Sequence, residues 1–219
     1  AAAGLIVSKY RNAGQTCVCA NRVYVQASIK EQFLTIFKQK VAALKIGDGL
    51  VADTDIGPMI NQKAIEKVEA LLSDALEKGA TLVAGGQRHD ASALSYAPTI
   101  LTDIKDHMDI AQQEIFGPVL QILRVNTMQE AMDLIDKHEY GNGTCIYTRD
   151  GEAARYFADN IQVGMVGINI PLPVPVAYQS FGGWKRSLFG DLFMYGPDGV
   201  RFFTRRKTIT QRWPSSEVR

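Results

Sequence analysis

The sequence has few residues suited to a metal site or a disulfide framework. Its 219 residues include only three cysteines and three histidines. An odd, small number of cysteines disfavours a disulfide scaffold and favours a reducing compartment, for which we expect the cytoplasm. The histidines have no ligand-like spacing to the Cys17-x-Cys19 pair, so we expect no metal.

The chain also lacks long apolar runs and any excess of charge of one sign. No apolar run approaches the roughly 18 residues that a membrane span needs. A formal net charge of +1 gives no electrostatic reason to expect binding to nucleic acid or to a membrane surface. The apolar residues 1–7 have no basic start and no cleavage pattern, which argues against a signal peptide. With 46% hydrophobic and 21% charged residues, the composition is typical of a soluble globular protein.

Helical and strand patterns alternate along the whole chain. We predict helices over residues 1–13, from a capping Ser28 to about residue 44, from a capping Asn61 to about 78, and from caps at Thr127 and Asp150 to about 137 and 160. The predicted strands are 23–25, 81–83, 98–101, 119–125, 144–148, 164–169 and 208–213. This alternation predicts an α/β fold with a mainly parallel, twisted sheet covered by helices on both faces, in one domain spanning 1–219.

Cys17 is the most informative single residue. It lies in the run Arg11–Cys19 (RNAGQTCVC), just after a glycine that is suited to end a helix. A thiolate presented on such a turn is a strong nucleophile near neutral pH. A cysteine after a helix is more often a small buried hydrophobe, so this run alone does not decide between the two interpretations.

Three further runs strengthen the first interpretation. They are Glu114–Pro118 (EIFGP), Ser180–Lys185 (SFGGWK) and Thr208–Trp213 (TITQRW). Taken together with the cysteine run, they resemble the signatures of the aldehyde dehydrogenase superfamily, across the length of its C-terminal catalytic half.

The resemblance implies a role for several residues. Cys17 is expected to attack an aldehyde carbon, and its backbone N–H is expected to stabilise the oxyanion. Glu114 is expected to accept hydrogen bonds from the hydroxyls of a nicotinamide ribose, with Phe116 packing nearby. Ordinary core packing is the alternative for Phe116. Phe181 lies in the run that resembles the loop beside the substrate tunnel, which makes it a candidate substrate-binding residue.

The front of the chain resembles succinate-semialdehyde dehydrogenases. The run Gly14–Arg22 (GQTCVCANR) carries this similarity. In that subfamily an arginine six residues before the nucleophile grips the substrate carboxylate, and Arg11 stands at that position. A solvated or helix-capping charge is the alternative for Arg11. Cys19 matches a cysteine that forms a redox-sensitive disulfide with the nucleophile in some members.

The back of the chain resembles methylmalonate-semialdehyde dehydrogenases, which pass the acyl group to coenzyme A. The runs Tyr140–Gly151, Pro171–Val176 and Phe181–Asp191 carry this similarity. That subfamily usually has an arginine directly before the nucleophile, where this chain has Thr16. The sequence thus leaves both small acidic semialdehydes open, although Arg11 favours succinate semialdehyde. It also leaves open whether the mixture is natural or the product of recombination or engineering.

The sequence contains no Gly-x-Gly-x-x-Gly fingerprint for a dinucleotide. In the family, an N-terminal domain makes most contacts with NAD or NADP, and we expect that domain to be absent here. The chain alone would then be inactive as a dehydrogenase. Family members dimerise or form tetramers through this half, so a homo-oligomer built partly by the C-terminal strand is expected. A self-associating module without catalysis and a thiol acyl-transferase or esterase that uses Cys17 without nicotinamide are the alternatives.

Overall fold

A four-stranded sheet organises the first part of the chain. The computed structural model describes residues 1–214. Its strands are β1 (Arg22–Gln26), β2 (Thr81–Ala84), β3 (Thr99–Thr102) and β4 (Val119–Val125), in the order β1-β4-β3-β2. β4 runs parallel to both β1 and β3, whereas β2 is antiparallel to β3. The α/β fold with a mainly parallel sheet is therefore confirmed.

Helices cover this sheet and complete its core. They are α1 (Ala2–Tyr10), α2 (Lys30–Ala42), α3 (Gln62–Glu77) and the short α4 (Asp109–Gln112). α1 packs against α2, where the rings of Tyr10 and Phe37 are stacked with centroids 6.2 Å apart. Phe37 is fully buried, and burying a side chain of this size stabilises the fold by about 2–3 kcal/mol.

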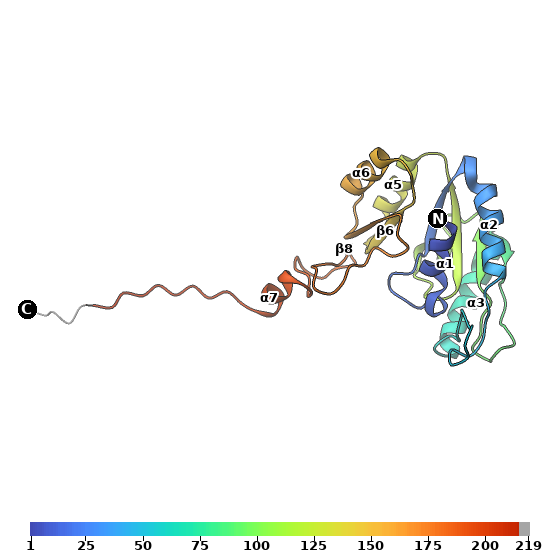
Figure 1. Cartoon of the computed structure of the whole chain (residues 1–219), viewed down its shortest axis with the longest axis horizontal. Coiled ribbons are helices and arrows are strands. Elements are labelled where there is room, and N and C mark those ends of the chain that lie inside the picture. Colours follow the sequence, from blue (N-terminus) through green and yellow to red (C-terminus); the bar gives the residue numbers. More distant parts are fainter. Residues whose placement is uncertain (215–219) are drawn as a thin grey trace, which may run out of the picture.

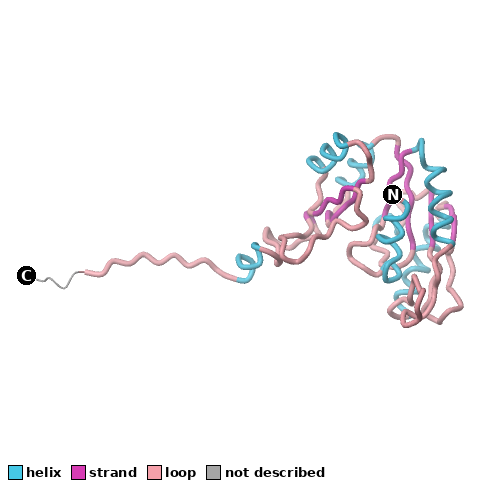
Figure 2. The backbone as a smooth tube through the Cα atoms, viewed as in Figure 1, coloured by secondary structure: helices cyan, strands magenta, loops and turns pink. Residues whose placement is uncertain are grey.

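A second, smaller lobe follows β4. It contains α5 (Met128–Lys137), β6 (Gly143–Ile146), α6 (Gly151–Asn160) and β7 (Met165–Ile168), with β6 parallel to β7. Its core is a separate cluster of buried residues: Met132, Phe157, Ile161 and Val163. Figure 2 shows its strands apart from those of the main sheet. The described residues thus enclose two hydrophobic cores, where the sequence predicted one compact domain.

A short antiparallel pair fastens the later part of the chain to this lobe. β5 (Tyr140–Gly141) pairs with β8 (Trp184–Lys185). The amino group of Lys185 donates to the carbonyls of Ile135, Asp136 and His138 at 3.4, 2.8 and 3.2 Å. A cation at the carboxyl end of a helix interacts favourably with its dipole, so Lys185 both caps α5 and fixes β8.

The chain ends in an exposed tail. After α7 (Pro197–Phe203), residues 204–214 project from the body and belong to no helix or strand (Figure 1). The strand predicted at Thr208–Trp213 is therefore not formed within this chain. A strand needs a hydrogen-bonding neighbour, and no other part of the described chain lies beside this segment.

Two helix boundaries also differ from the predictions. Ile29, not Ser28, precedes α2 and makes no side-chain cap, because the short 3-10 turn Ala27–Ile29 (η2) comes directly before the helix. A second 3-10 turn, Arg11–Gly14 (η1), follows α1. α1 ends at Tyr10, and the backbone leaves the helix at Asn12 and Ala13, which have φ of 49° and 54°. No helix among residues 1–214 is both long enough and apolar enough to cross a membrane.

Candidate active site

The Cys17 loop and the Glu114–Pro118 run, almost a hundred residues apart, are in direct contact. Gly14 adopts φ of +76°, and a side chain there would collide with the carbonyl of Gly117 and approach the nitrogen of Pro118. Only glycine combines this backbone conformation with such a close approach. Gly14 thus seats the loop on the second motif.

Hydrogen bonds within the loop and to the segment around Ile60 give the loop a defined shape. The N–H of Cys19 donates to the carbonyl of Thr16 at 3.1 Å, and the hydroxyl of Thr16 lies 2.6 Å from the sulfur of Cys19. The side chain of Gln15 donates to the Asn12 carbonyl at 3.0 Å and accepts from the N–H of Ile60 at 2.8 Å. The Cys17 thiol remains exposed at the tip of this turn, where an external electrophile can reach it.

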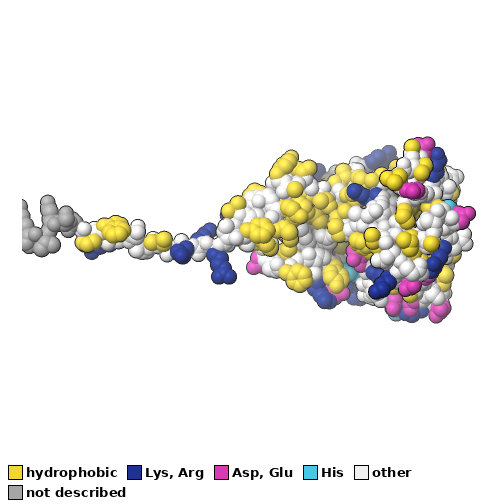
Figure 3. Space-filling view, turned by 90° about the horizontal axis from the view of Figure 1, so that it is seen from below, with side chains coloured by type: hydrophobic (Ala, Val, Ile, Leu, Met, Phe, Trp, Pro, Cys, Tyr) yellow, Lys and Arg dark blue, Asp and Glu magenta, His cyan; other side chains and the backbone are white. Residues whose placement is uncertain are grey.

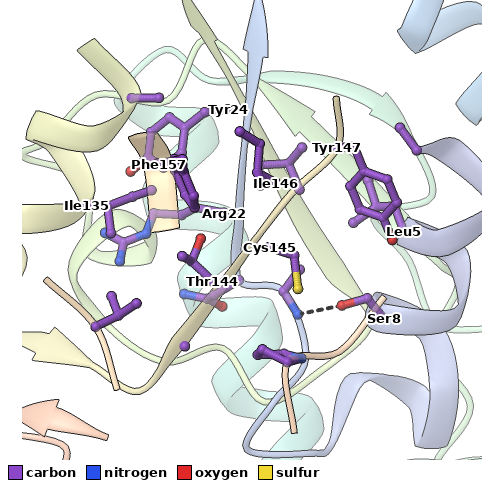
Figure 4. Close-up of a pocket in the computed structure, with 18 of the residues that line it drawn as sticks. Leu5, Ser8, Arg22, Tyr24, Ile135, Thr144, Cys145, Ile146, Tyr147 and Phe157 are labelled. Carbon is purple, nitrogen blue, oxygen red and sulfur yellow. Dashed lines mark hydrogen bonds between the residues drawn. The ribbon is translucent and has the colours of Figure 1, made fainter. Parts of the chain in front are cut away.

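Cys17 and Cys19 line a cavity of about 580 Å³ between β1 and β6. Figure 4 shows Arg22 and Tyr24 of β1 facing Thr144, Cys145 and Ile146 of β6 across it. Burial raises the pKa of the Cys145 thiol to about 11. Cys145 is therefore held as a neutral thiol near pH 7, unlike a nucleophile.

Glu114 and Phe116 line a second cavity, of about 340 Å³. Gln15 lines it too, so residues of the nucleophile loop line both cavities. Lys67 of α3 donates from its amino group to the backbone carbonyl of Glu114 at 2.5 Å, which leaves the exposed carboxylate unengaged by Lys67. Phe116 has φ of 53° and is 40% exposed. Core packing, the alternative for Phe116, therefore does not describe its environment.

The two residues that were predicted to bind the substrate, Arg11 and Phe181, line neither cavity. Arg11 is exposed at the start of η1. Phe181 is stacked on Tyr195, with ring centroids 4.7 Å apart and planes 4° from parallel. The structure thus joins Cys17 with Cys19 and Glu114 with Phe116, but adds neither Arg11 nor Phe181 to these pairs.

Sequence reasoning missed a buried lysine behind the loop. Lys9 of α1 is only 1% exposed. Desolvation lowers its pKa to about 8, while the negative forms of Cys19 and Glu114 oppose part of that change. A lysine in a helix is usually exposed, so nothing in the local pattern marks Lys9 as buried. Asn142 was also missed: its side chain contacts the backbone of Cys17.

The profile of the Aldehyde dehydrogenase family matches residues 1–209. The chain belongs to the aldehyde dehydrogenase family. It is 48% identical to the malonate-semialdehyde dehydrogenase of Pseudomonas aeruginosa over 219 residues, which cover 98% of this chain and 44% of that aldehyde dehydrogenase. The fold and the family that the sequence indicated are confirmed.

Solved structures of other aldehyde dehydrogenases have the same fold as this chain. The methylmalonate-semialdehyde dehydrogenase from Oceanimonas doudoroffii is 51% identical with a TM-score of 0.92, over 99% of this chain and 46% of that one. One from Sinorhizobium meliloti 1021, complexed with NAD, is 42% identical with a TM-score of 0.92, over 99% and 45%. The succinate-semialdehyde dehydrogenase from Burkholderia pseudomallei is 38% identical with a TM-score of 0.84, over 90% and 40%. This chain therefore spans less than half the length of the relatives that it matches.

Aldehyde dehydrogenases of this family use NAD or NADP, and one of the matched structures is complexed with NAD. Within residues 1–214, no three His, Cys, Asp or Glu side chains are grouped as a metal site would require. The second cavity is compatible with one end of a nicotinamide cofactor, because it offers an exposed carboxylate for ribose hydroxyls beside an aromatic ring.

Proposed function

We propose that this chain is the thiol-bearing part of an NAD(P)-dependent aldehyde dehydrogenase for a small acidic semialdehyde, with methylmalonate or malonate semialdehyde preferred to succinate semialdehyde. The observation that carries the proposal is an exposed Cys17 on a turn seated against Gly117, within a chain 48% identical to a malonate-semialdehyde dehydrogenase. The proposal replaces the preference for succinate that Arg11 suggested.

The chemistry assigned to Cys17 is nucleophilic. The thiolate forms a C–S bond with the aldehyde carbon, and the electron pair of the C=O bond moves to oxygen. The backbone N–H of Cys17 would lie next to the attacked carbonyl and is suited to stabilise this oxyanion. A bound nicotinamide would supply the hydride acceptor for this carbon, and Cys17 would then hold the acyl group as a thioester.

The acyl group of the thioester is then transferred to an acceptor thiol or to water: a new C–S or C–O bond forms at the acyl carbon, its bond to Cys17 breaks, and the Cys17 thiolate leaves. Coenzyme A is the acceptor that the methylmalonate-semialdehyde resemblance implies, with water as the other possibility. Glu114, with its carboxylate at the second cavity, is proposed to bind the ribose hydroxyls, and Phe116 to pack on the same end of the cofactor. The three free thiols suit a reducing compartment, and we propose the cytoplasm.

The choice between semialdehydes rests on two observations. The relatives at 48% and 51% identity are named for malonate and methylmalonate semialdehyde, against 38% for the succinate enzyme. Arg11, the residue that favoured succinate, lies outside the cavity that Cys17 lines. An arginine that binds the substrate carboxylate is most effective when it holds the substrate next to the nucleophile. The position of Arg11 therefore weakens the succinate hypothesis.

An activated-ester assay tests the thiol chemistry without a cofactor. We expect the chain to release p-nitrophenolate from p-nitrophenyl monoesters of methylmalonate and succinate, about tenfold faster from the methylmalonate ester, a difference of about 1.4 kcal/mol in transition-state binding. Cys17→Ser should abolish the release, and Cys145→Ser should leave it unchanged. Hydrolysis that persists in Cys17→Ser would refute the assignment of Cys17 as the nucleophile. Faster hydrolysis of the succinate ester than of the methylmalonate ester would refute the proposed substrate preference.

A second assay tests the redox step. Absorbance at 340 nm follows cofactor reduction with each semialdehyde and NAD or NADP, with and without coenzyme A. We expect the chain alone to give no turnover while Cys17 is still alkylated stoichiometrically by iodoacetamide. Cysteine-dependent turnover would show that these 219 residues suffice. Acceleration by coenzyme A would identify it as the acyl acceptor.

Self-association is the second candidate function, favoured by the exposed apolar residues near the chain end. Figure 3 shows apolar side chains on the face between the body and the tail. The exposed ones from residue 170 onward are Ile170, Val174, Val176, Tyr178, Trp184, Phe189, Met194, Tyr195, Val200, Phe202, Phe203, Ile209 and Trp213. We propose that a second copy of the chain covers part of this surface in a dimer or tetramer.

A further inference from the structure

Asn142 connects the second lobe to the Cys17 loop. It is the only residue between β5 and β6, and it is half-buried. Its side-chain amide donates to the backbone carbonyl of Cys17 at 3.0 Å. Within residues 1–214, this is the one hydrogen bond that joins residues 16–19 to any residue after β4.

The backbone around Asn142 is itself fixed by the segment 183–187. The N–H of Gly141 donates to the hydroxyl of Ser187 at 3.2 Å, and Gly141 pairs with Trp184 across β5 and β8. Gly183 packs directly on Asn142, because a Cβ on Gly183 would lie 3.2 Å from the Cα of Asn142. A continuous set of contacts therefore runs from segment 183–187 through Asn142 to the carbonyl of Cys17.

We propose that Asn142 is a positioning residue for the Cys17 thiol, acting through the Cys17 carbonyl. This inference rests on the proposed function, in which Cys17 is the nucleophile. A held carbonyl fixes the orientation of the Cys17–Val18 peptide, and with it the direction of the thiol on a four-residue turn closed by Thr16 and Cys19. Misplacing a reacting group by 1 Å costs about 100-fold in rate, so a tether of this kind affects chemistry more than binding.

The test compares two matched substitutions in the full chain. Asn142→Leu keeps a branched side chain of similar size but removes the donor. The control is Asn160→Leu, which removes an amide donor to the Tyr156 carbonyl at 2.8 Å at the end of α6. The two readouts are amide hydrogen exchange of residues 16–20 and Cys17-dependent hydrolysis of p-nitrophenyl acetate.

We expect Asn142→Leu to speed exchange of residues 16–20 about fivefold, the effect of losing one ordinary hydrogen bond, while exchange in β4 stays unchanged. Its kcat for hydrolysis should fall about tenfold with KM within about twofold, and Asn160→Leu should change neither. A merely structural role would raise exchange in β4 as well. Unchanged exchange of residues 16–20, or a change in KM alone, would overturn the proposal.

Asn142→Asp provides a second variant if the leucine variant does not fold. A carboxylate has no donor near neutral pH and would repel the Cys17 carbonyl, so the same loss in kcat is expected. If the unaltered chain shows no Cys17-dependent hydrolysis, the proposed function fails. The exchange experiment then still decides whether Asn142 holds the loop.

Discussion

The buried Lys9 is the residue whose environment departs furthest from what its chemistry favours. Lys9 lies on α1, and its side chain is buried near Cys19. Desolvation lowers its pKa from 10.5 to about 8. Below pH 8 the folded protein holds a charge in an apolar site, which costs stability. A destabilising residue at this place is consistent with a role near the loop rather than in folding.

Lys9→Met tests this view. Between about pH 8 and 10.5 the unfolded chain keeps the Lys9 proton while the folded chain releases it, so the stability of the unaltered protein rises with pH over this window. The variant should therefore be more stable by up to about 3 kcal/mol near pH 7, and the advantage should shrink toward pH 10.5. Urea unfolding at several pH values measures it, with the exposed Lys40→Met as control. An advantage that is constant with pH would contradict the lowered pKa.

Helix caps show how far the sequence determines the elements. Asn61, Thr127 and Asp150 were predicted as caps, and each accepts a hydrogen bond from the backbone of its helix. These positions are determined locally, because each capping side chain accepts from a backbone N–H two or three residues further along the chain. The prediction of Ser28 as a cap was wrong because the 3-10 turn Ala27–Ile29 occupies the position where the helix was expected to begin.

The candidate site was predictable in part for the same reason. The runs around Cys17 and Glu114 were predicted because they resemble family signatures, in which glycine and proline stand at fixed positions of a short local pattern. Lys67 and Asn142 act through hydrogen bonds to residues far away in sequence, at separations of 47 residues for Lys67 to Glu114 and 125 for Asn142 to Cys17. The burial of Lys9 likewise depends on the tertiary fold. No local pattern encodes such contacts.

The cap of α6 gives a prediction at the scale of the element. The Asp150 carboxylate accepts from the N–H groups of Glu152 and Ala153 at 2.8 and 3.2 Å. We expect Asp150→Ala to lower the free energy of unfolding by about 1 kcal/mol, because two N–H groups lose their partner and a negative charge leaves the helix start. Asp159→Ala, an exposed site near the other end of α6, is the control in thermal unfolding. Equal losses in both variants would contradict the capping role.

At the scale of the whole molecule, the body and the tail differ in how their apolar residues are used. The body encloses two cores, whereas Ile209 and Trp213 of the tail are 71% and 83% exposed. A segment with such residues and no partner strand among residues 1–214 is suited to pair with an exposed sheet edge of a second copy. Self-association would then depend on the tail and be independent of the thiol.

A chain ended after Phe203 tests this dependence. We expect the full chain to elute as a dimer or larger on a sizing column with light scattering, and the shortened chain to elute as a monomer, because the unpaired segment and its apolar residues are removed. Cys17→Ser should remain associated, which separates assembly from chemistry. A shortened chain that stays dimeric would move the interface to the apolar face of residues 170–203. A full chain that is monomeric at all concentrations would refute self-association by this chain, while Cys17-dependent ester hydrolysis would still stand on its own measurement.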